Sequence, residues 1–273
     1  MPDPTTRPFL KWPGGKYRLI KRIQSALGDG RRLIEPFTGS GAVFLNTRYQ
    51  EYLLADSNPD LISLYRQLTT EGPAFIRYCQ TFFRESSNNS EQFYRYREEF
   101  NRTSNHRRKS ALFLYLNRHC YNGLVRYNKR GEFNTPFGRH IKPYFPAGEM
   151  KQFLIAADKA IFLHAGFQEC MEHARRGDVV YCDPPYAPLT KTACFTDYHT
   201  GGFSWTQQLQ LTELSVQLAS RGVKIVISNH DIAPIRKIYK QAGAKISRFQ
   251  VRRTISSDIA NRGKAGELIA IIG

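Results

Sequence analysis

The protein has 273 residues, enough for one large α/β domain or for a domain that carries an insertion. Hydrophobic residues make up 41% of the chain and charged residues 23%, a globular composition that excludes a disordered or fibrous protein. The net charge of +17 comes from 40 Lys and Arg residues against 23 Asp and Glu residues. Such an excess favours a polyanionic partner, either nucleic acid or an acidic membrane.

Neither a membrane anchor nor a metal site is indicated by the sequence. No apolar run approaches the ~20 residues of a membrane-spanning helix, and the N-terminus lacks the features of a signal peptide. We therefore expect a cytoplasmic protein with no membrane partner, and the charge favours a monomer that tracks along its substrate. The histidines show no metal spacing, and the cysteines form no C-x-x-C pair. We expect no metal, and buried free thiols at Cys79, Cys120, Cys170, Cys182 and Cys194.

The first predicted element is a helix after the WPGGK motif. Leu19, Ile20, Ile23 and Leu27 recur at helical spacing, and Gly28 is a natural helix stop. This spacing predicts a helix with one apolar face.

Short strands are predicted next, at 31–35 and 52–55, with a helix over 41–49 between them. Asn58 and Pro59 are typical of the N-cap and first position of another helix. The chain therefore opens with a β-α-β-α alternation.

The same alternation returns in the last third of the chain, where apolar runs predict strands and amphipathic runs predict helices. The strand candidates are 161–165, 178–182, 224–228 and 267–272, and the helix candidates are 206–220 and 231–243. Strands separated by helices predict an α/β fold with a doubly wound, mostly parallel sheet.

The middle of the chain, residues 84–145, lacks this alternation. It holds 13 Lys and Arg residues against five Asp and Glu residues, nearly half of the charge excess of the chain. Aromatic residues are interleaved with the charges, as phosphate contact and base stacking require: Phe93, Tyr94, Tyr96, Phe100, Tyr121, Tyr127, Phe133 and Phe137. We expect an inserted, largely helical nucleic-acid-binding domain. A plain helical insertion with its own core fits Phe113 and Tyr115, but it does not explain the charge.

A glycine motif, EPFTGSG (35–41), ends the first predicted strand. Gly39 lets the backbone approach a ligand, and Asp56 ends the next strand 17 residues later, where an acidic side chain takes ribose hydroxyls. Phe44 replaces the third glycine of a dinucleotide motif, so a nucleoside without phosphates, such as S-adenosylmethionine, fits better. A generic turn remains the alternative for this motif alone.

The tetrapeptide Asp183-Pro184-Pro185-Tyr186 directly follows an apolar strand. Two prolines stiffen the chain and remove two N–H donors, which leaves carbonyls as acceptors beside the carboxylate. A carboxylate and a proline carbonyl can accept both hydrogens of an exocyclic amino group while the tyrosine stacks on its base. A base in a duplex reaches such a site only when it is flipped out of the helix. A proline-stiffened surface loop is the alternative.

Segments along nearly the whole chain resemble the Dam-type DNA adenine-N6 methyltransferases. They are FLKWPGGK (9–16), IEPFTGSGAVFLN (34–46), LADSNPDLISLY (54–65), LYLNRHCYNGLVRYNKRGEFNTPFGR (114–139), KPYF (142–145), VVYCDPPYAPL (179–189), SNHD (228–231) and RRTISS (252–257). Their order is that of the alpha group of this family. The resemblance implies a Rossmann-like methyltransferase fold and transfer of a methyl group from S-adenosylmethionine to adenine in GATC of double-stranded DNA.

The resemblance also implies roles for individual residues. The expected cofactor contacts are Trp12, Gly14, Lys16, Glu35, Phe37, Gly39, Asp56, Phe167 and Asp183. The expected catalytic residues are Asp183, Pro184, Pro185 and Tyr186. The expected DNA contacts are Lys11 at the outer guanine, Tyr121 and Asn122 at the gap left by the flipped base, Arg126 on a guanine, and Pro136 and Arg139 in the same loop.

The implied domains are a catalytic domain, 1–57 and 146–273, and a DNA-recognition insertion, 58–145. The sequence departs from the family pattern at Pro13 and at His119-Cys120, so the DNA contacts assigned next to these positions rest on fewer matching residues. Two interpretations stand for Arg252, Arg253 and Ser256. They contact DNA phosphates, or they belong to a solvated basic loop. His230 is interpreted as a turn-stabilising residue and Cys182 as a buried strand residue.

Two other functions compete with this one. N-P-P-Y and S-P-P-Y relatives methylate protein glutamine or cytosine N4, but an aspartate precedes P-P-Y in this chain. A DNA-binding regulator without activity would keep the fold, but the glycine motif, Lys16, Asp56 and D-P-P-Y are all intact.

Overall fold

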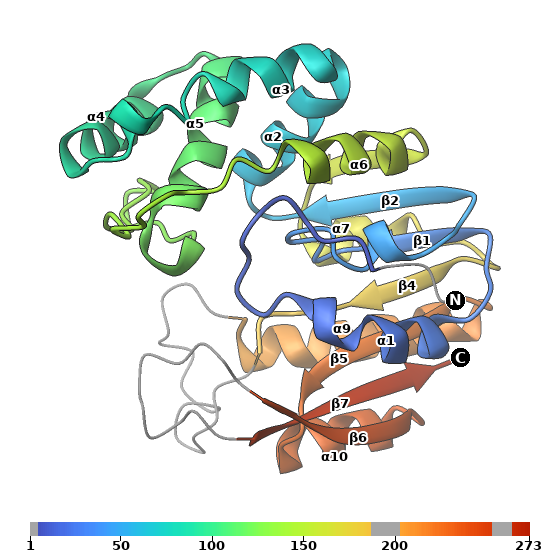
Figure 1. The fold of residues 1–273 in the computed structure, drawn as a ribbon. Coiled ribbons are helices and arrows are strands. Elements are labelled where there is room, and N and C mark those ends of the chain that lie inside the picture. Colours follow the sequence, from blue (N-terminus) through green and yellow to red (C-terminus); the bar gives the residue numbers. More distant parts are fainter. Residues whose placement is uncertain (1–4, 187–202, 253–263) are drawn as a thin grey trace. The chain divides into compact units, whose positions relative to one another are not determined.

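A computed structural model of the chain describes residues 5–186, 203–252 and 264–273 (Figure 1). The chain forms two compact units. The first unit consists of Met1–Ile20, Thr38–Arg48 and Asp56–His164, and the second of Lys21–Phe37, Tyr49–Ala55 and Ala165–Gly273. Among the described residues, no helix is both long and apolar enough to cross a membrane. The predicted domain boundaries, 1–57, 58–145 and 146–273, stay a prediction.

A mostly parallel sheet forms the centre of the second unit (Figure 1). Its strands lie in the order β2-β1-β4-β5-β7-β6. Their bounds are β1 Arg32–Glu35, β2 Glu51–Asp56, β4 Val179–Cys182, β5 Lys224–His230, β6 Lys245–Arg252 and β7 Lys264–Ile272. β1 pairs in parallel with β2 and β4, and β4 pairs in parallel with β5, whereas β7 is antiparallel to β5 and β6. The predicted fold class is therefore confirmed.

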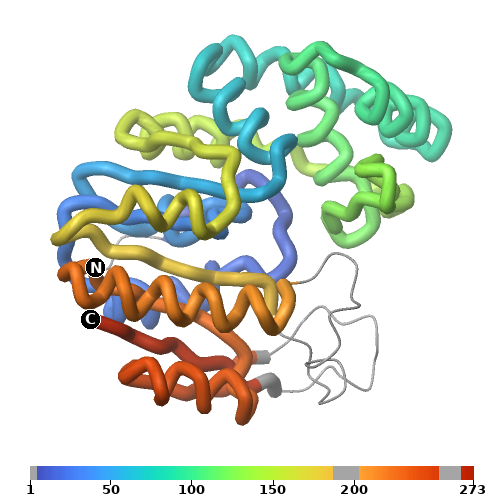
Figure 2. The backbone as a smooth tube through the Cα atoms, turned by 180° about the vertical axis from the view of Figure 1, so that it is seen from behind, coloured from blue at the N-terminus to red at the C-terminus, as the bar shows by residue number. Residues whose placement is uncertain are grey.

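Helices cover both faces of this sheet. α7 (Phe167–Glu172), α9 (Trp205–Ser220) and α10 (Ala233–Gln241) pack on one another and on the face that is nearer the viewer in Figure 2. α1 (Ile20–Leu27) lies on the opposite face (Figure 1). All four residues of β4 are buried, as expected of a central parallel strand between two helical layers.

The first unit is mainly helical and also contains β3 (Ala160–His164). Its helices are α2 Pro59–Glu71, α3 Pro73–Gln80, α4 Ser90–Arg102, α5 His106–His119 and α6 Ala147–Ala157. α5 is the central helix, because residues Ala111 to Leu116 are all fully buried and α2, α3 and α4 pack against it. The predicted N-cap of α2 is confirmed, since the side chain of Asn58 accepts the backbone N–H groups of Asp60 and Leu61.

The predicted helix over 41–49 is wrong. The segment forms only a short 3-10 turn, Phe44–Asn46. The side chains of Asn46 and Thr47 donate to the carbonyls of Ala42 and Val43, which a continuing helix would have used for its own backbone bonds. The sequence reading also missed the edge strand β6 and the short helix α7.

Candidate active site

The glycine motif forms a tight turn in the first unit, and other elements hold it in place. Gly39 has a left-handed φ of 49°, and a Cβ on it would lie 2.8 Å from the Trp12 indole nitrogen, so only glycine fits. The Gly39 N–H donates to the Asp56 carboxylate over 3.0 Å, and its carbonyl accepts from the Tyr65 hydroxyl over 2.6 Å. The structure therefore brings together Trp12, Gly39 and Asp56, three of the predicted cofactor contacts.

Asp56 is a carboxylate held by backbone donors at the end of β2. One of its oxygens accepts the Gly39 N–H, and the other accepts the Asn58 N–H over 2.9 Å. Burial raises the pKa of Asp56 above its ordinary value, and the two N–H donors partly offset this rise. A fixed, half-buried carboxylate of this kind can accept hydrogen bonds from ligand hydroxyls.

The WPGGK motif contributes a buried lysine to the first unit. Lys16 is only 6% exposed, and its ammonium donates to the Gly14 carbonyl over 2.8 Å. Gly14 has a φ of 74°, a conformation that suits glycine. Both residues are predicted cofactor contacts, and they lie together.

Aromatic rings form a compact cluster in the second unit. The rings of Phe37 and Phe167 stack with centroids 5.7 Å apart, and Phe203 packs edge-on against both at 5.5 and 5.4 Å. Glu35, at the end of β1, is 2% exposed. Phe203 was not among the residues predicted from the sequence. The sequence feature that could have pointed to it is its position just before Ser204, the N-cap residue of α9 and the start of a capping box. Such a cluster is a suitable apolar wall for a ligand ring.

The D-P-P-Y motif begins directly after β4, also in the second unit. Asp183 is half-buried, Pro184 buried and Pro185 exposed, while the half-buried Tyr186 lies edge-to-face against His230, with ring centroids 4.1 Å apart. Burial, with a smaller contribution from the Asp183 charge, raises the pKa of Tyr186, so the phenol stays neutral. The motif thus places a carboxylate, a buried proline and a neutral phenol in one short segment.

The S-N-H-D segment at the end of β5 supports this motif. Ser228 shares a hydrogen bond of 2.9 Å with the Tyr181 hydroxyl of β4. Asn229 is fully buried and donates to the side chains of Gln208 and Tyr239. His230 therefore sits on a rigid strand and serves as a packing partner of Tyr186.

The predicted DNA contacts gather on a small hairpin of the first unit, residues 120–137. Backbone bridges join Cys120 to Phe137 and Tyr127 to Phe133, and a turn lies between them at 128–131. The Tyr121 N–H donates to the Pro136 carbonyl over 2.9 Å. Four of the six predicted contacts belong to this hairpin: Tyr121, Asn122, Arg126 and Pro136. Arg139 follows it by two residues.

The sixth contact, Lys11, is tied to the same hairpin. Its backbone exchanges hydrogen bonds of 2.9 and 2.7 Å with the side chain of Asn117 on α5, and Asn117 also donates to the Gly123 carbonyl. A Cβ on Gly123 would lie 2.4 Å from the Lys11 Cβ, so glycine is required there. Burial, followed by the charge of Arg118, lowers the pKa of Lys11.

Arg126 is exposed, and its side chain is already oriented. Its guanidinium donates to the side-chain oxygen of Asn134 over 2.7 Å and contacts the carbonyl of the same residue at 3.3 Å. These bonds leave further guanidinium donors for a partner, because arginine carries five N–H groups.

Part of the predicted basic, aromatic surface is structural instead. Phe93, Phe100 and Phe133 are at most 1% exposed, so the expectation that they stack on bases is wrong. They form the core of the first unit together with Phe113 and Tyr115, whose core role is confirmed. Of the aromatic residues predicted to stack on bases, Tyr94 and Tyr121 are exposed, at 40% and 54%.

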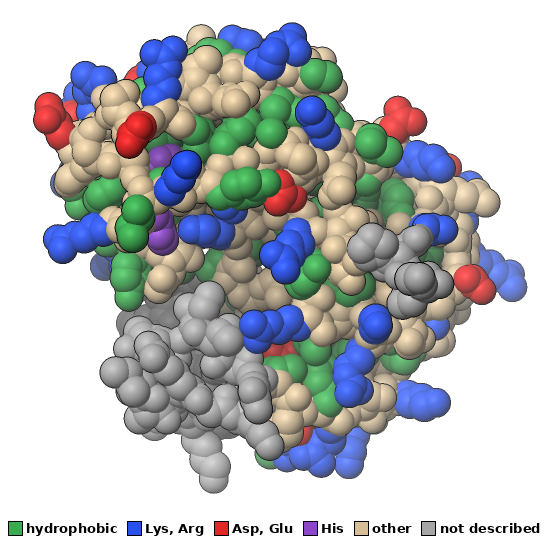
Figure 3. All heavy atoms as spheres, viewed as in Figure 1, with side chains coloured by type: hydrophobic (Ala, Val, Ile, Leu, Met, Phe, Trp, Pro, Cys, Tyr) green, Lys and Arg blue, Asp and Glu red, His purple; other side chains and the backbone are tan. Residues whose placement is uncertain are grey.

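Cationic side chains of the first unit also have internal roles. Arg107, Arg108 and Lys109 form ion pairs with Glu71, Glu99 and Asp60, respectively. These three basic residues at the start of α5 therefore stabilise the unit itself. Other Lys and Arg side chains are spread over the face shown in Figure 3 and are exposed to a partner.

A reactive cysteine or a cluster of potential metal ligands would form a second reactive centre. Cys79, Cys120, Cys170 and Cys182 are buried free thiols, as predicted, and burial raises the pKa of Cys182 well above its ordinary value. Within the described part of the chain, no cluster of three His, Cys, Asp or Glu residues could hold a metal ion. Cys194, Arg253 and Ser256 lie outside the described residues, and so does the side chain of Arg252.

Comparisons with known proteins identify the family. The family model for D12 class N6 adenine-specific DNA methyltransferases matches residues 12–255. The chain is 50% identical to the "DNA adenine methylase" of Serratia marcescens over 266 residues, covering 97% of this chain and 98% of that protein. It is 47% identical to the "DNA adenine methylase" of Escherichia coli strain K12, covering 97% and 95%. These matches confirm the resemblance noted in the sequence: the chain is an enzyme of the D12 class N6 adenine-specific DNA methyltransferase family.

Proposed function

We propose that the protein transfers a methyl group from S-adenosylmethionine to the N6 amino group of adenine within GATC of double-stranded DNA. The observation that carries this proposal is the D-P-P-Y motif at the end of the buried strand β4, with Tyr186 packed on His230. Family membership supports adenine as the target.

Each unit holds residues that suit one part of the methyl donor. The glycine turn lets a ligand approach the Gly39 backbone, and the Asp56 carboxylate can accept the ribose hydroxyls. Phe37, Phe167 and Phe203 offer an apolar wall for an adenine ring. When bound, S-adenosylmethionine supplies an electrophilic methyl group on a positively charged sulfur.

The target base has to leave the duplex before it can reach Asp183. Flipping costs a few kcal/mol, which contacts to the base and to the opened helix offset. We assign Tyr121 and Asn122 to the gap in the stack, because Tyr121 is exposed at the tip of the turn after α5. Arg126 reads a guanine with its oriented guanidinium, while Lys11, Pro136 and Arg139 complete the contacts around the target sequence.

The chemistry of the step is direct displacement. The Asp183 carboxylate and the Pro184 carbonyl accept the two amino hydrogens and shift the nitrogen towards tetrahedral geometry, so that its lone pair can attack. Tyr186 stacks on the base. The amino group becomes more acidic as the new N–C bond forms, and a carboxylate of ordinary basicity can then take its proton.

The discriminating experiment measures methyl transfer and binding together. Wild-type protein is incubated with isotope-labelled S-adenosylmethionine and duplexes that contain or lack GATC. We expect label on the GATC duplex alone. Binding without transfer would instead favour an inactive DNA-binding regulator, and equal transfer to both duplexes would contradict the proposed GATC specificity.

A further inference from the structure

We propose that Tyr127 is a positioning residue whose hydroxyl couples DNA binding at the hairpin 120–137 to methyl-donor binding at Asp56. The inference rests on the proposed function, in which the hairpin contacts DNA and Asp56 contacts the donor. All residues involved belong to the first unit of the chain.

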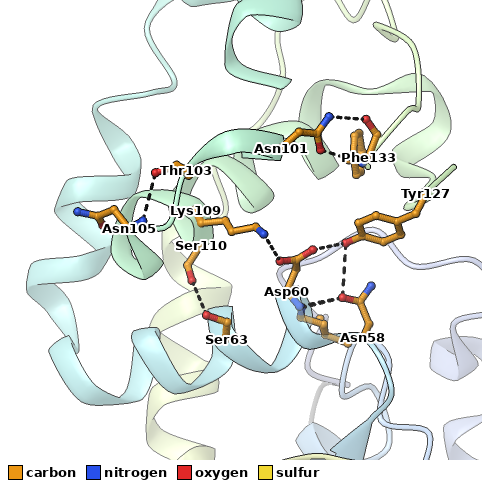
Figure 4. Close-up of polar contacts among 11 residues, drawn as sticks. Asn58, Asp60, Ser63, Asn101, Thr103, Asn105, Lys109, Ser110, Tyr127 and Phe133 are labelled. Atoms are coloured by element: carbon orange, nitrogen blue, oxygen red, sulfur yellow. Dashed lines mark hydrogen bonds and ion pairs between the residues drawn. The ribbon is translucent and has the colours of Figure 1, made fainter. Parts of the chain in front are cut away.

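The first link joins the hairpin to the start of α2 (Figure 4). The Tyr127 hydroxyl donates to the Asp60 carboxylate over 2.7 Å and also lies 3.5 Å from the side-chain oxygen of Asn58. The Lys109 ammonium of α5 forms an ion pair with the other Asp60 oxygen over 3.3 Å. One phenol of the hairpin is therefore bound by two residues at the start of α2.

The second link joins α2 to the glycine turn. The N–H of Asn58 donates to Asp56, and the second oxygen of Asp56 accepts from Gly39. Further along the same helix, the Tyr65 hydroxyl donates to the Gly39 carbonyl over 2.6 Å. α2 thus contacts the hairpin at its start and the glycine turn through Tyr65, so a shift of α2 affects both.

The role of the Tyr127 hydroxyl can be tested separately from the packing of its ring. The Tyr127 ring lies edge-on to Phe133 with centroids 6.0 Å apart, and this contact does not need the oxygen. Burial, followed by the Asp60 charge, raises the pKa of Tyr127, so the phenol remains a proton donor. Tyr127 directly follows Arg126, so a shift of the ring would move the predicted guanine contact.

Thermodynamic linkage gives this arrangement a measurable consequence. If donor binding at Asp56 favours the position of α2 that the hairpin needs, the donor tightens DNA binding, and DNA tightens donor binding by the same factor. Couplings between sites typically reach about 5- to 150-fold.

The test compares the affinity for a GATC duplex with and without S-adenosylhomocysteine, the product of the donor. We expect the wild type to bind the duplex at least about fivefold more tightly with S-adenosylhomocysteine, and Tyr127→Phe to reduce this ratio below about twofold. The matched control is Tyr144→Phe. It removes another tyrosine–carboxylate bond of the first unit, to Glu149 at 3.0 Å, and should keep the wild-type ratio.

A second pair of variants covers the case in which Tyr127→Phe does not fold. Asp60→Asn keeps an acceptor oxygen for the phenol and should retain most of the coupling, whereas Asp60→Ala should lose it. A purely structural role would weaken both affinities equally and leave the ratio unchanged. That result, or a wild type without coupling, overturns the inference. If the wild type fails to bind the donor or to methylate adenine, the proposed function itself is wrong.

Discussion

Asn122 and Arg139 are the two non-glycine residues in the described ranges with left-handed backbone, at φ values of 53° and 52°. Both are predicted DNA contacts. A non-glycine residue in this region costs of the order of 1–3 kcal/mol, and such costs are often found at functional sites. The backbone conformation thus singles out two of the residues that the resemblance assigns to DNA contact.

At the residue scale, Asp183 should be essential for chemistry but not for binding. We expect Asp183→Ala to lower the rate of methyl transfer by at least ~100-fold, because the amino group loses its anionic acceptor. The affinity for a GATC duplex should change little. Filter binding and label incorporation measure the two quantities, and Asp158→Ala, at an exposed position, is the control. Near-normal turnover of Asp183→Ala would exclude the aspartate from the chemistry.

Arg126 should control discrimination more than affinity. We expect Arg126→Ala to lower, by about 10-fold, the preference for GATC over a duplex with one substituted G·C pair, since bidentate guanine contacts contribute ~1–3 kcal/mol. Arg130→Ala, at an exposed site in the turn of the same hairpin, should leave the preference unchanged. Equal loss of affinity for both duplexes in Arg126→Ala would make Arg126 a phosphate contact.

At the element scale, the sequence predicted those helix ends and strands that depend on residues close together in the chain. The N-cap at Asn58 and the apolar strand before Asp183 were found because capping and burial leave a pattern within a few residues. The edge strand β6 was missed because its side chains are mostly exposed or half-buried, so it lacks the apolar run of a central strand. The contact of Lys11 with Asn117 joins residues 106 positions apart and leaves no local pattern.

His119, near the end of α5, should make stability depend on pH. Its ring is 1% exposed and stacks on Tyr115 at 3.8 Å, and burial lowers its pKa to about 4. In the unfolded chain the pKa of His119 is near 6.5, so this histidine takes up a proton at a higher pH than it does in the folded protein. The free energy of unfolding therefore falls as the pH drops from 6.5 towards 4. We expect this histidine to contribute a loss of about 2 kcal/mol between pH 7.5 and 5.

Urea unfolding at pH 7.5 and at pH 5 measures this contribution. The loss of stability should be smaller in His119→Gln than in the wild type. His106→Gln, at the exposed start of the same helix, should behave like the wild type. An unchanged loss in His119→Gln would show that this ring does not titrate with folding.

At the scale of the whole molecule, the charge of +17 by itself favours a polyanionic partner, and the family match identifies that partner as DNA. The sequence could not show which cations are used internally, because the pairing of Arg107 with Glu71 and of Arg108 with Glu99 depends on how the helices pack. Fewer than the 40 Lys and Arg residues are therefore free to contact DNA, while the net excess of +17 is unchanged, because each ion pair also neutralises one acidic residue. Exposed Lys and Arg side chains remain on the face shown in Figure 3.

DNA binding should weaken steeply with salt. Each neutralised phosphate adds about 0.9 to the slope of log affinity against log salt concentration, because counterions are released on binding. We expect a slope of several units for duplexes with and without GATC. Binding of S-adenosylhomocysteine alone, measured in the same buffers, is the control and should vary little. A flat salt dependence would contradict binding through phosphate contacts.

The proposed mechanism depends on one atom, the exocyclic nitrogen of adenine, which Asp183 and Pro184 are proposed to hold. It is tested most directly by incubating the protein with methyl-labelled S-adenosylmethionine and a GATC duplex, digesting the DNA to nucleosides and identifying the labelled product by mass spectrometry. We predict label only in N6-methyl-2′-deoxyadenosine. Label in N4-methyl-2′-deoxycytidine, or DNA without label from active, folded protein, would contradict the claim.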